Sequence, residues 1–374
     1  MTLRGAIAHS EASLGWGGQE HRVITELVGF GSRGLKTKLA APLKSGISER
    51  AKEAGIHTTY FNYRRIEFLV DLLKATSWLR ESNIQILNTH SSRDGWLMGV
   101  AGRIARTPLI IRSRHIEVEY PNAWVSRHAF KTFADLVITT SDRITTGLQD
   151  ALNLSRDRVV TVPTGIDIER FKPRREVAPR YASGISDWRP VVGMVSVLRS
   201  WKGHAIFLRA IKLLLHQGID LRGIIVGEGP QKQNIEKSID SLSLVNDVHM
   251  TGHVENVHEV LQDMDLLIIP STDHEGIPQI GLQSLACGTP VIGSNVGGIP
   301  EIIKDKITGR IVPAADPHKL ADSIKAALLE KDITRQYAKA GLELVRKHHT
   351  VDCMLNRLDS IYESFLQSKI RKPN

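Results

Sequence analysis

Cysteine is scarce in this sequence: only Cys287 and Cys353 occur in 374 residues. Two cysteines cannot build a disulfide framework, which favours a reducing compartment. The first residues, MTLRGAIAHSEASLGWGG, lack a charged start followed by a long apolar core, so we expect no signal peptide. No apolar run reaches the roughly 18 residues of a membrane-spanning helix. We therefore expect a cytoplasmic protein, with peripheral contact to the inner face of the cytoplasmic membrane as an open alternative.

Zinc-ligand spacing, a basic zipper and an aromatic RNA-binding signature are also lacking, so we expect no nucleic-acid partner. The net charge is nevertheless +9, and it is unevenly spread. Residues 1–165 contain 22 Lys and Arg against 15 Asp and Glu, whereas the remainder contains 27 against 25. A basic half suggests a phosphate-bearing partner or an anionic membrane surface, and ordinary solubilising charge is an equal alternative.

Short runs of β-branched residues alternate with longer helix-patterned stretches along the chain. The candidate strands are RGAIAH, TKLAAP, IQILNTH, PLIIRSRH, LVITTS and RVVTVP in the first half, and PVVGMVSV, LRGIIVGEG, VHMTG, DLLIIPS and PVIGSN in the second. This alternation predicts parallel sheets with helices on both faces. We predict an α/β fold of two doubly wound, Rossmann-like domains facing across a cleft, over residues 1–165 and 191–350, with a linker over 166–190.

The stretch HEGIPQIGLQSLACGTPV, from His274 onward, follows a predicted strand, where doubly wound sheets bind ligands. A proline is tolerated in the first turn of a helix, and the N–H groups of such a turn form an anion site. An acid beside them can accept a hydrogen bond from a hydroxyl of the group that carries the phosphate. Helix capping is the alternative role of the acid. The candidate residues are Glu275, Gly276, Ile277, Pro278, Gln279 and Gln283.

The longer stretch STDHEGIPQIGLQSLACGTPVIGSNVGGIPEII resembles the donor-binding signature of retaining glycosyltransferase family 4, which has the GT-B fold. That signature has two glutamates eight positions apart; Glu275 matches the first, and Gln283 replaces the second. The resemblance implies that the first contacts the sugar, that nearby amides hold the phosphates, and that the second binds the ribose. Because Gln283 accepts hydrogen bonds without a charge, we expect a weaker ribose contact.

Three further stretches of the second half resemble parts of the same family. In VGMVSVLRSWKGHAIFLRAI, the resemblance places Arg199 and Lys202 on the diphosphate, where two fixed cations stabilise the departing charge. Considered without the family, both are more often solvated strand-end charges. IIVGEGPQKQNIE and HMTGHVENV resemble loops that receive the base. Their candidate residues are Gly227, Glu228, His253 and Val254.

The first half also carries parts of the resemblance. LGWGGQEHRVITEL places Gly17 and Gly18 before a helix, where small residues allow a phosphate to approach. The resemblance implies that this loop faces the donor phosphates or the acceptor, and Gly17 and Gly18 are donor-binding candidates. His115 ends a strand at the position where the family often has a His that points at the donor sugar, although a lone strand-end His is usually structural. NTHSSRDGWLMG adds acceptor-side candidates, with capping by the acid as an equal alternative. These are His90, Arg93 and Asp94.

The resemblance runs through nearly the whole chain and implies a hexosyltransferase. The catalytic residues would be His115, Arg199, Lys202 and Glu275, and a helix over 351–374 would cross back to the first domain. The substrates would be a UDP- or GDP-sugar and a glycan or lipid-linked acceptor of bacterial lipopolysaccharide or surface polysaccharide. We expect no metal and no other cofactor. The alternatives are a GT-B nucleotide-sugar epimerase and an inactive nucleotide-sugar-binding protein.

One amphipathic stretch bears on the membrane. YRRIEFLVDLLKATSWLR has Ile66, Leu69, Val70, Leu73 and Trp78 near helical spacing with basic residues alongside. Such a helix can lie on an anionic leaflet. A helix whose apolar face packs on the core is the slightly favoured interpretation.

Overall fold

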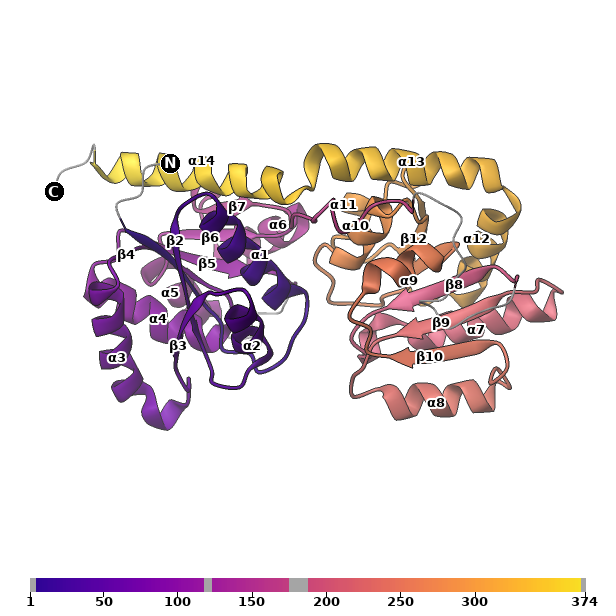
Figure 1. The fold of residues 1–374 in the computed structure, drawn as a ribbon, viewed down its shortest axis with the longest axis horizontal. Coiled ribbons are helices and arrows are strands. Elements are labelled where there is room, and N and C mark those ends of the chain that lie inside the picture. Colours follow the sequence, from indigo (N-terminus) through magenta and orange to yellow (C-terminus); the bar gives the residue numbers. More distant parts are fainter. Residues whose placement is uncertain (1–4, 118–122, 175–187, 371–374) are drawn as a thin grey trace. The chain divides into compact units, whose positions relative to one another are not determined.

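The computed structural model describes residues 5–117, 123–174 and 188–370 (Figure 1). The chain divides into two compact units, one formed by Met1–Gly165 with Val351–Asn374 and the other by Ile166–Thr350. Of the predicted linker over 166–190, residues 175–187 lie outside the described residues. Its first part is folded, because Ile166 and Phe171 are buried in the core of the second unit.

The first unit has a parallel sheet in the order β3-β2-β1-β4-β5-β6-β7. Its strands are β1 (Ala6–Ser10), β2 (Lys36–Ala41), β3 (His57–Tyr60), β4 (Ile84–Thr89), β5 (Leu109–Arg114), β6 (Leu136–Thr139) and β7 (Val159–Thr161). Its helices are α1 (Gly18–Ser32), α2 (Gly46–Glu53), α3 (Phe68–Glu81), α4 (Ser92–Ala105), α5 (Ala123–Thr132), α6 (Asp142–Leu152) and α14 (Val351–Ile370). Successive β1 residues point to opposite faces, so Ala6 and Ala8 pack under α3 and α4, whereas Ile7 packs under α1 and α14.

The second unit repeats the plan with a parallel sheet in the order β10-β9-β8-β11-β12-β13. Its strands are β8 (Val191–Val195), β9 (Arg222–Val226), β10 (Val248–Gly252), β11 (Leu266–Ile269), β12 (Val291–Ser294) and β13 (Arg310–Val312). Its helices are α7 (His204–His216), α8 (Lys232–Ser241), α9 (Val257–Asp263), α10 (Gln279–Ala286), α11 (Ile299–Ile302), α12 (Pro317–Leu329) and α13 (Lys331–His348). One apolar core lies under α7, α8 and α12, and a second lies under α9, α10, α11 and α13. The prediction of two doubly wound parallel sheets is confirmed.

The last helix, α14, belongs to the first unit although the chain reaches it from the second (Figure 1). Tyr362 is fully buried, and its ring lies 5.8 Å from that of Phe30 on α1. Arg33 and Asp359 form an ion pair of 2.9 Å across the same contact. The predicted return of the C-terminal helix is therefore confirmed.

Two strands were not predicted, β3 and β13, and each lies at an edge of its sheet. The strand β3 reads HTTY, and none of its residues is fully buried. The strand β13 has only three residues, of which Val312 alone is buried. A run of buried β-branched residues marks a strand that is covered on both faces, and edge strands are short and half covered. The pattern used for the central strands therefore misses them.

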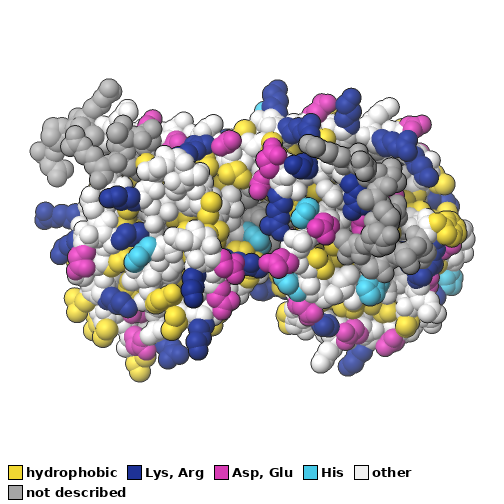
Figure 2. All heavy atoms as spheres, viewed as in Figure 1, with side chains coloured by type: hydrophobic (Ala, Val, Ile, Leu, Met, Phe, Trp, Pro, Cys, Tyr) yellow, Lys and Arg dark blue, Asp and Glu magenta, His cyan; other side chains and the backbone are white. Residues whose placement is uncertain are grey.

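The helix α3 has two apolar faces. One face carries Ala75 and Leu79 into the core, as the favoured interpretation predicts. The other carries the four spaced side chains, which are between 69% and 92% exposed. They are Ile66, just before the helix, and Leu69, Val70 and Leu73. Figure 2 shows hydrophobic side chains on this part of the surface with Lys and Arg among them. The prediction that the spaced apolar residues face the core is confirmed for Trp78 and wrong for these four.

Candidate active site

An acid and a base meet in the second unit at the carboxyl ends of β8 and β11. Lys202 Nζ lies 2.5 Å from Oε1 of Glu275, although the two residues are 73 positions apart in the chain. The Ser271 hydroxyl donates to the same oxygen at 2.6 Å. The Glu275 side chain is only 6% exposed. A buried carboxylate needs such partners, and here a cation and a hydroxyl supply them.

Backbone packing holds the Glu275 loop against the loop that follows β12. A Cβ on Gly297 would lie 2.0 Å from the Glu275 carbonyl oxygen, and Gly297 has a φ of +53°. The next residue, Gly298, donates its N–H to that oxygen at 3.3 Å. A residue with a side chain at Gly297 would therefore displace the Glu275 loop.

The rest of the predicted anion site lies around the start of α10. Gly276 and Ile277 are buried, and Pro278 is the N-cap residue. Gln279 is the first helical residue, and Gln283 follows one turn later with a partly exposed side chain. The predicted helix start is confirmed. Because helix N-termini attract anions, the place suits a phosphate.

Arg199 is exposed to solvent and directly precedes the turn that carries Lys202. It caps a short 3₁₀ turn over Ser200–Lys202, and its guanidinium lies 5.1 Å from the Trp201 ring. The Trp201 ring also meets the His274 ring edge-on, with centroids 5.7 Å apart. The Thr272 N–H donates to the Trp201 carbonyl at 2.7 Å. The loop that carries Arg199 and Lys202 is thus joined to the loop that carries Glu275.

The four residues predicted for the base lie on the loops after β9 and β10. Gly227 has a φ of +131°, and a Cβ there would lie 1.9 Å from the Ser196 carbonyl oxygen. Glu228 is exposed and accepts from Lys232 at 3.0 Å. His253 is exposed and Val254 half-buried. The two loops meet, because a Cβ on Gly252 would lie 2.9 Å from a Glu228 carboxylate oxygen.

The first unit brings His90 and His115 together and adds a third ring that sequence reasoning missed. His90 Nδ1 lies 2.9 Å from His115 Nε2, and His90 Nε2 lies 2.9 Å from His9 Nδ1. His9 and His90 are buried, and His115 is partly exposed. Burial lowers the pKa of His9 to about 4 and the pKa of His90 and His115 well below 6.5, so all three rings are neutral at pH 7.

Asp94 holds the backbone beside these rings. Its carboxylate accepts the N–H of His90 at 2.8 Å, the Ser10 hydroxyl at 2.7 Å, and both the N–H and the hydroxyl of Ser91. It is fully buried at the first turn of α4 and forms a capping box with Ser91. Four protein donors occupy the two oxygens of Asp94. The geometry therefore agrees with the alternative role of Asp94 as a helix-capping residue.

A second buried acid was missed. Glu11 follows β1, accepts the Ser13 N–H at 2.9 Å and is hydrogen-bonded by Gln19. Burial, then the charges of Asp94 and Glu20, raises its pKa to about 8. Gln19 directly follows Gly17 and Gly18, the N-cap and first residue of α1. Glu11 therefore anchors the glycine loop that the sequence singles out.

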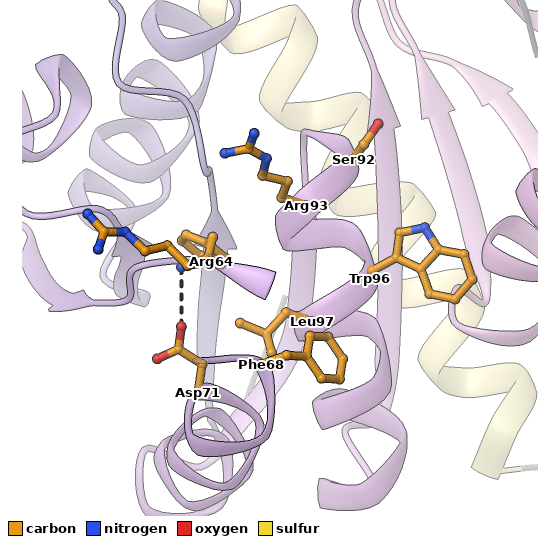
Figure 3. Close-up of a pocket in the computed structure, with 8 residues that line it drawn as sticks. Arg64, Phe68, Asp71, Ser92, Arg93, Trp96 and Leu97 are labelled. Atoms are coloured by element: carbon orange, nitrogen blue, oxygen red, sulfur yellow. Dashed lines mark hydrogen bonds between the residues drawn. The ribbon is translucent and has the colours of Figure 1, made fainter. Parts of the chain in front are cut away.

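Arg93 lines a cavity of about 380 Å³ between α3 and α4. Figure 3 shows Phe68 and Leu97 side by side, with the guanidinium groups of Arg64 and Arg93 away from that apolar pair. The full lining is Tyr63, Arg64, Phe68, Asp71, Ser92, Arg93, Trp96 and Leu97. None of His9, His90 and His115 lines this cavity. Arg93 and His90, both predicted for the acceptor, therefore lie in different places in the first unit.

The acids of DMD at 263–265 have structural partners. Asp263 accepts from Arg174 at 2.7 Å, and Asp265 accepts the Val191 N–H at 2.8 Å. Within the described ranges, no group of three or more His, Cys, Asp or Glu residues could hold a metal ion.

Comparison with known families decides the class of the protein. Residues 180–343 match the model described as glycosyl transferases group 1, and residues 16–170 match the model described as glycosyltransferase family 4. The chain belongs to the family 4 glycosyltransferases. The two matches meet near the boundary between the two units of this glycosyltransferase.

Among curated proteins, this glycosyltransferase is similar to the glycosyltransferase EpsF of Bacillus subtilis, with 26% identity over 60% of this chain and 58% of EpsF. It is also similar to WcaL of Escherichia coli, named a colanic acid biosynthesis glycosyltransferase, with 30% identity over 60% of this chain and 55% of WcaL. The chain thus spans a little over half the length of these relatives.

Among solved structures, Anabaena HepE in complex with UDP and glucose superposes with a TM-score of 0.87. The match has 19% identity and covers 96% of this chain and 100% of HepE. At this identity the likeness establishes the fold, which is GT-B.

Proposed function

We propose that this glycosyltransferase moves a hexose-type sugar from a UDP- or GDP-sugar to a glycan or lipid-linked acceptor, with retention of configuration. The UDP and glucose bound by HepE support a nucleotide-sugar donor, and the name of WcaL, a colanic acid biosynthesis glycosyltransferase, supports an acceptor of the surface-polysaccharide kind. Lipopolysaccharide is included in the proposal as an acceptor of the same kind. The observation that carries the proposal is the contact between Lys202 and Glu275 beside the start of α10.

The second unit has the charges that departure of a nucleotide requires. Breaking the sugar–phosphate bond leaves added negative charge on the diphosphate. Lys202, Arg199 and the N-terminus of α10 are positive groups at one edge of the sheet, and fixed positive groups lower the energy of that transition state. This arrangement meets the phosphate charge with protein groups, so the proposal includes no metal and no other cofactor.

Glu275 orients the sugar in this proposal and is not its nucleophile. Its Oε1 accepts from Lys202 and from Ser271, and these two contacts hold the carboxylate beside the group proposed for the diphosphate, which suits binding of the sugar. Retention then follows from attack of the acceptor hydroxyl on the face that the phosphate leaves, with the leaving phosphate oxygen taking the hydroxyl proton. The acceptor is assigned to the first unit, beside His115 and the loop of Gly17 and Gly18.

Peripheral contact with an anionic membrane is also part of the proposal. Two features support this contact. The first is the exposed apolar row of Ile66, Leu69, Val70 and Leu73, which could enter a leaflet. The second is positive charge, from exposed Arg64 and from the excess of Lys and Arg in residues 1–165, which would attract anionic lipids. A lipid-linked acceptor would be met at such a surface. Among the residues that the structure describes, no helix is apolar over a length that could cross a bilayer.

The test is incubation of the purified protein with panels of UDP- and GDP-sugars, each with and without lipid-linked and soluble glycan acceptors. We expect acceptor-dependent release of one nucleotide and a product with the anomeric configuration of the donor. Binding of a nucleotide-sugar with no release for any acceptor would identify an inactive binder. Conversion of the free nucleotide-sugar to its epimer would identify an epimerase.

A further inference from the structure

Three neighbouring strands of the first sheet each bring one imidazole to the same edge. His9 lies near the end of β1, His90 directly follows β4, and His115 directly follows β5, and these strands are adjacent in the order β1-β4-β5. The ring centroids are 5.0 Å and 5.1 Å apart, with interplanar angles of 18° and 26°. This spacing matches the separation of neighbouring strands, roughly 4.8 Å. The rings form a hydrogen-bonded stack.

The inner end of the stack meets a carboxylate. His9 Nε2 lies 3.7 Å from Oε2 of Glu26 on α1, and both atoms are buried. Within the described residues neither atom has a hydrogen-bond partner, so each faces the other as its natural partner. The second oxygen of Glu26 is held by Arg22 Nε at 2.6 Å. Because a guanidinium only donates, Arg22 keeps Glu26 a carboxylate acceptor.

The carboxylate decides where every ring carries its proton. At 3.7 Å this contact is electrostatic and not a hydrogen bond, and it favours a proton on His9 Nε2, because the lone pair of a bare nitrogen would repel the carboxylate. His9 Nδ1 is then bare and accepts from Nε2–H of His90. His90 Nδ1 is bare in turn and accepts from Nε2–H of His115. Since each neutral ring has one proton, Nδ1 of His115 is left without one.

We propose that Glu26, through His9 and His90, locks His115 in the Nε2–H form, so that its Nδ1 accepts a hydrogen bond from a hydroxyl of the sugar substrate. This inference rests on the proposed function for the identity of the ligand. Glu26, His9 and His90 are positioning residues. The depressed pKa values of the three rings agree with it, because neutral rings are required for a defined direction along the stack.

The direction of the stack gives the site a chemical preference. A bare ring nitrogen accepts from a hydroxyl, which can donate its proton. It repels a carboxylate, which has no proton to give and carries a negative charge. The site should therefore favour sugars with a hydroxyl at the position facing His115 over sugars with a carboxylate there.

Glu26→Gln tests the direction without any substrate. Arg22 requires an oxygen acceptor, so the new amide must turn its oxygen to Arg22 and its NH₂ to His9. His9 Nε2 must then be bare, and every proton in the stack moves to the opposite nitrogen. Long-range ¹H–¹⁵N spectra of the histidine side chains, assigned with single His variants, should show His115 as Nε2–H in the wild type and as Nδ1–H in Glu26→Gln. An Nδ1–H form in the wild type, or an unchanged form in the variant, overturns the proposal.

A second variant, His9→Phe, tests the proposal independently in case Glu26→Gln does not fold. His9→Phe keeps a ring in the stack and removes both nitrogens, so His115 should lose its single tautomer. An unchanged single tautomer contradicts the proposal. The matched control is Glu49→Gln, an exposed acid on α2, which should leave the His115 spectrum as in the wild type.

Turnover separates the two proposals. In Glu26→Gln, nucleotide-sugar turnover should fall at least tenfold while binding of UDP or GDP alone is unchanged, because the second unit holds the nucleotide. Wild-type turnover in a variant with an inverted His115 shows that the tautomer does not serve the sugar. A wild type that binds no nucleotide-sugar overturns the proposed function, and the spectra still decide the direction of the stack.

Discussion

Lys202 Nζ and Glu275 Oε1 lie 2.5 Å apart and join the turn before α7 to the loop after β11. Lys202 is partly exposed, and Glu275 is nearly closed off from solvent. The contact therefore ties the cation proposed for the diphosphate to the acid proposed for the sugar. We therefore expect loss of either side chain to disturb the position of the other and to lower sugar transfer.

Lys202→Ala and Glu275→Gln should each lower sugar transfer by at least about 100-fold. Lys202→Ala removes a positive charge that stabilises the departing diphosphate, and Glu275→Gln removes the carboxylate that orients the sugar. Lys202→Ala also leaves a buried carboxylate without its cation, at a cost of about 1–3 kcal/mol in the free energy of unfolding. Nucleotide release and urea unfolding measure the two effects. The control is Lys172→Ala, which breaks an exposed 3.3 Å pair with Glu169. Wild-type rates in Lys202→Ala would exclude the site.

Gln283→Glu restores a charged acceptor on α10, one turn inside the helix. A carboxylate accepts hydroxyl donors more strongly than an amide does, so we expect nucleotide binding to be equal or up to about tenfold tighter. Calorimetry with UDP and GDP measures it, with Gln217→Glu, an exposed position after α7, as the control. Weaker binding in Gln283→Glu would mean that the amide N–H donates to the ligand.

The central strands and the second-unit motifs could be predicted because their residues are contiguous in the chain. Lys202 and Glu275 could be paired only through the resemblance, because their contact depends on β8 and β11 being neighbours. The histidine stack left a sequence signal that went unused: AIAHS, ILNTH and IRSRH each place a His at a strand end. Strand order alone turns that signal into a contact. No sequence signal marks Glu26 as a buried partner of the stack, because a glutamate within a helix usually faces solvent.

Glu11 should make stability fall as the solution becomes alkaline. Its folded-state pKa is raised from 4.5 to about 8, so the folded protein holds a proton that the unfolded chain releases. Its contribution to stability is present at low pH and is lost as pH rises through about 8. Between pH 7 and pH 8.5 the loss is about 1 kcal/mol.

Glu11→Gln should abolish this loss, because the amide does not titrate. Urea unfolding at pH 7 and pH 8.5 measures the difference, and the exposed acid of Glu49→Gln is the control. An equal alkaline loss in wild type and Glu11→Gln would show that Glu11 is ionised in the folded protein at pH 7.

The exposed row on α3 predicts binding to anionic vesicles. Leu69 and Leu73 are 73% and 74% exposed, and inserting such a side chain into a leaflet gains about 1.5 kcal/mol or more. Leu69→Ser and Leu73→Ser should each weaken co-sedimentation with phosphatidylglycerol vesicles roughly tenfold, and salt should weaken the wild type because its basic residues contribute. Val245→Ser and Leu329→Ser, at exposed positions of the second unit, are matched controls. Equal losses in all four variants would mean that general surface hydrophobicity, and not α3, holds the vesicles.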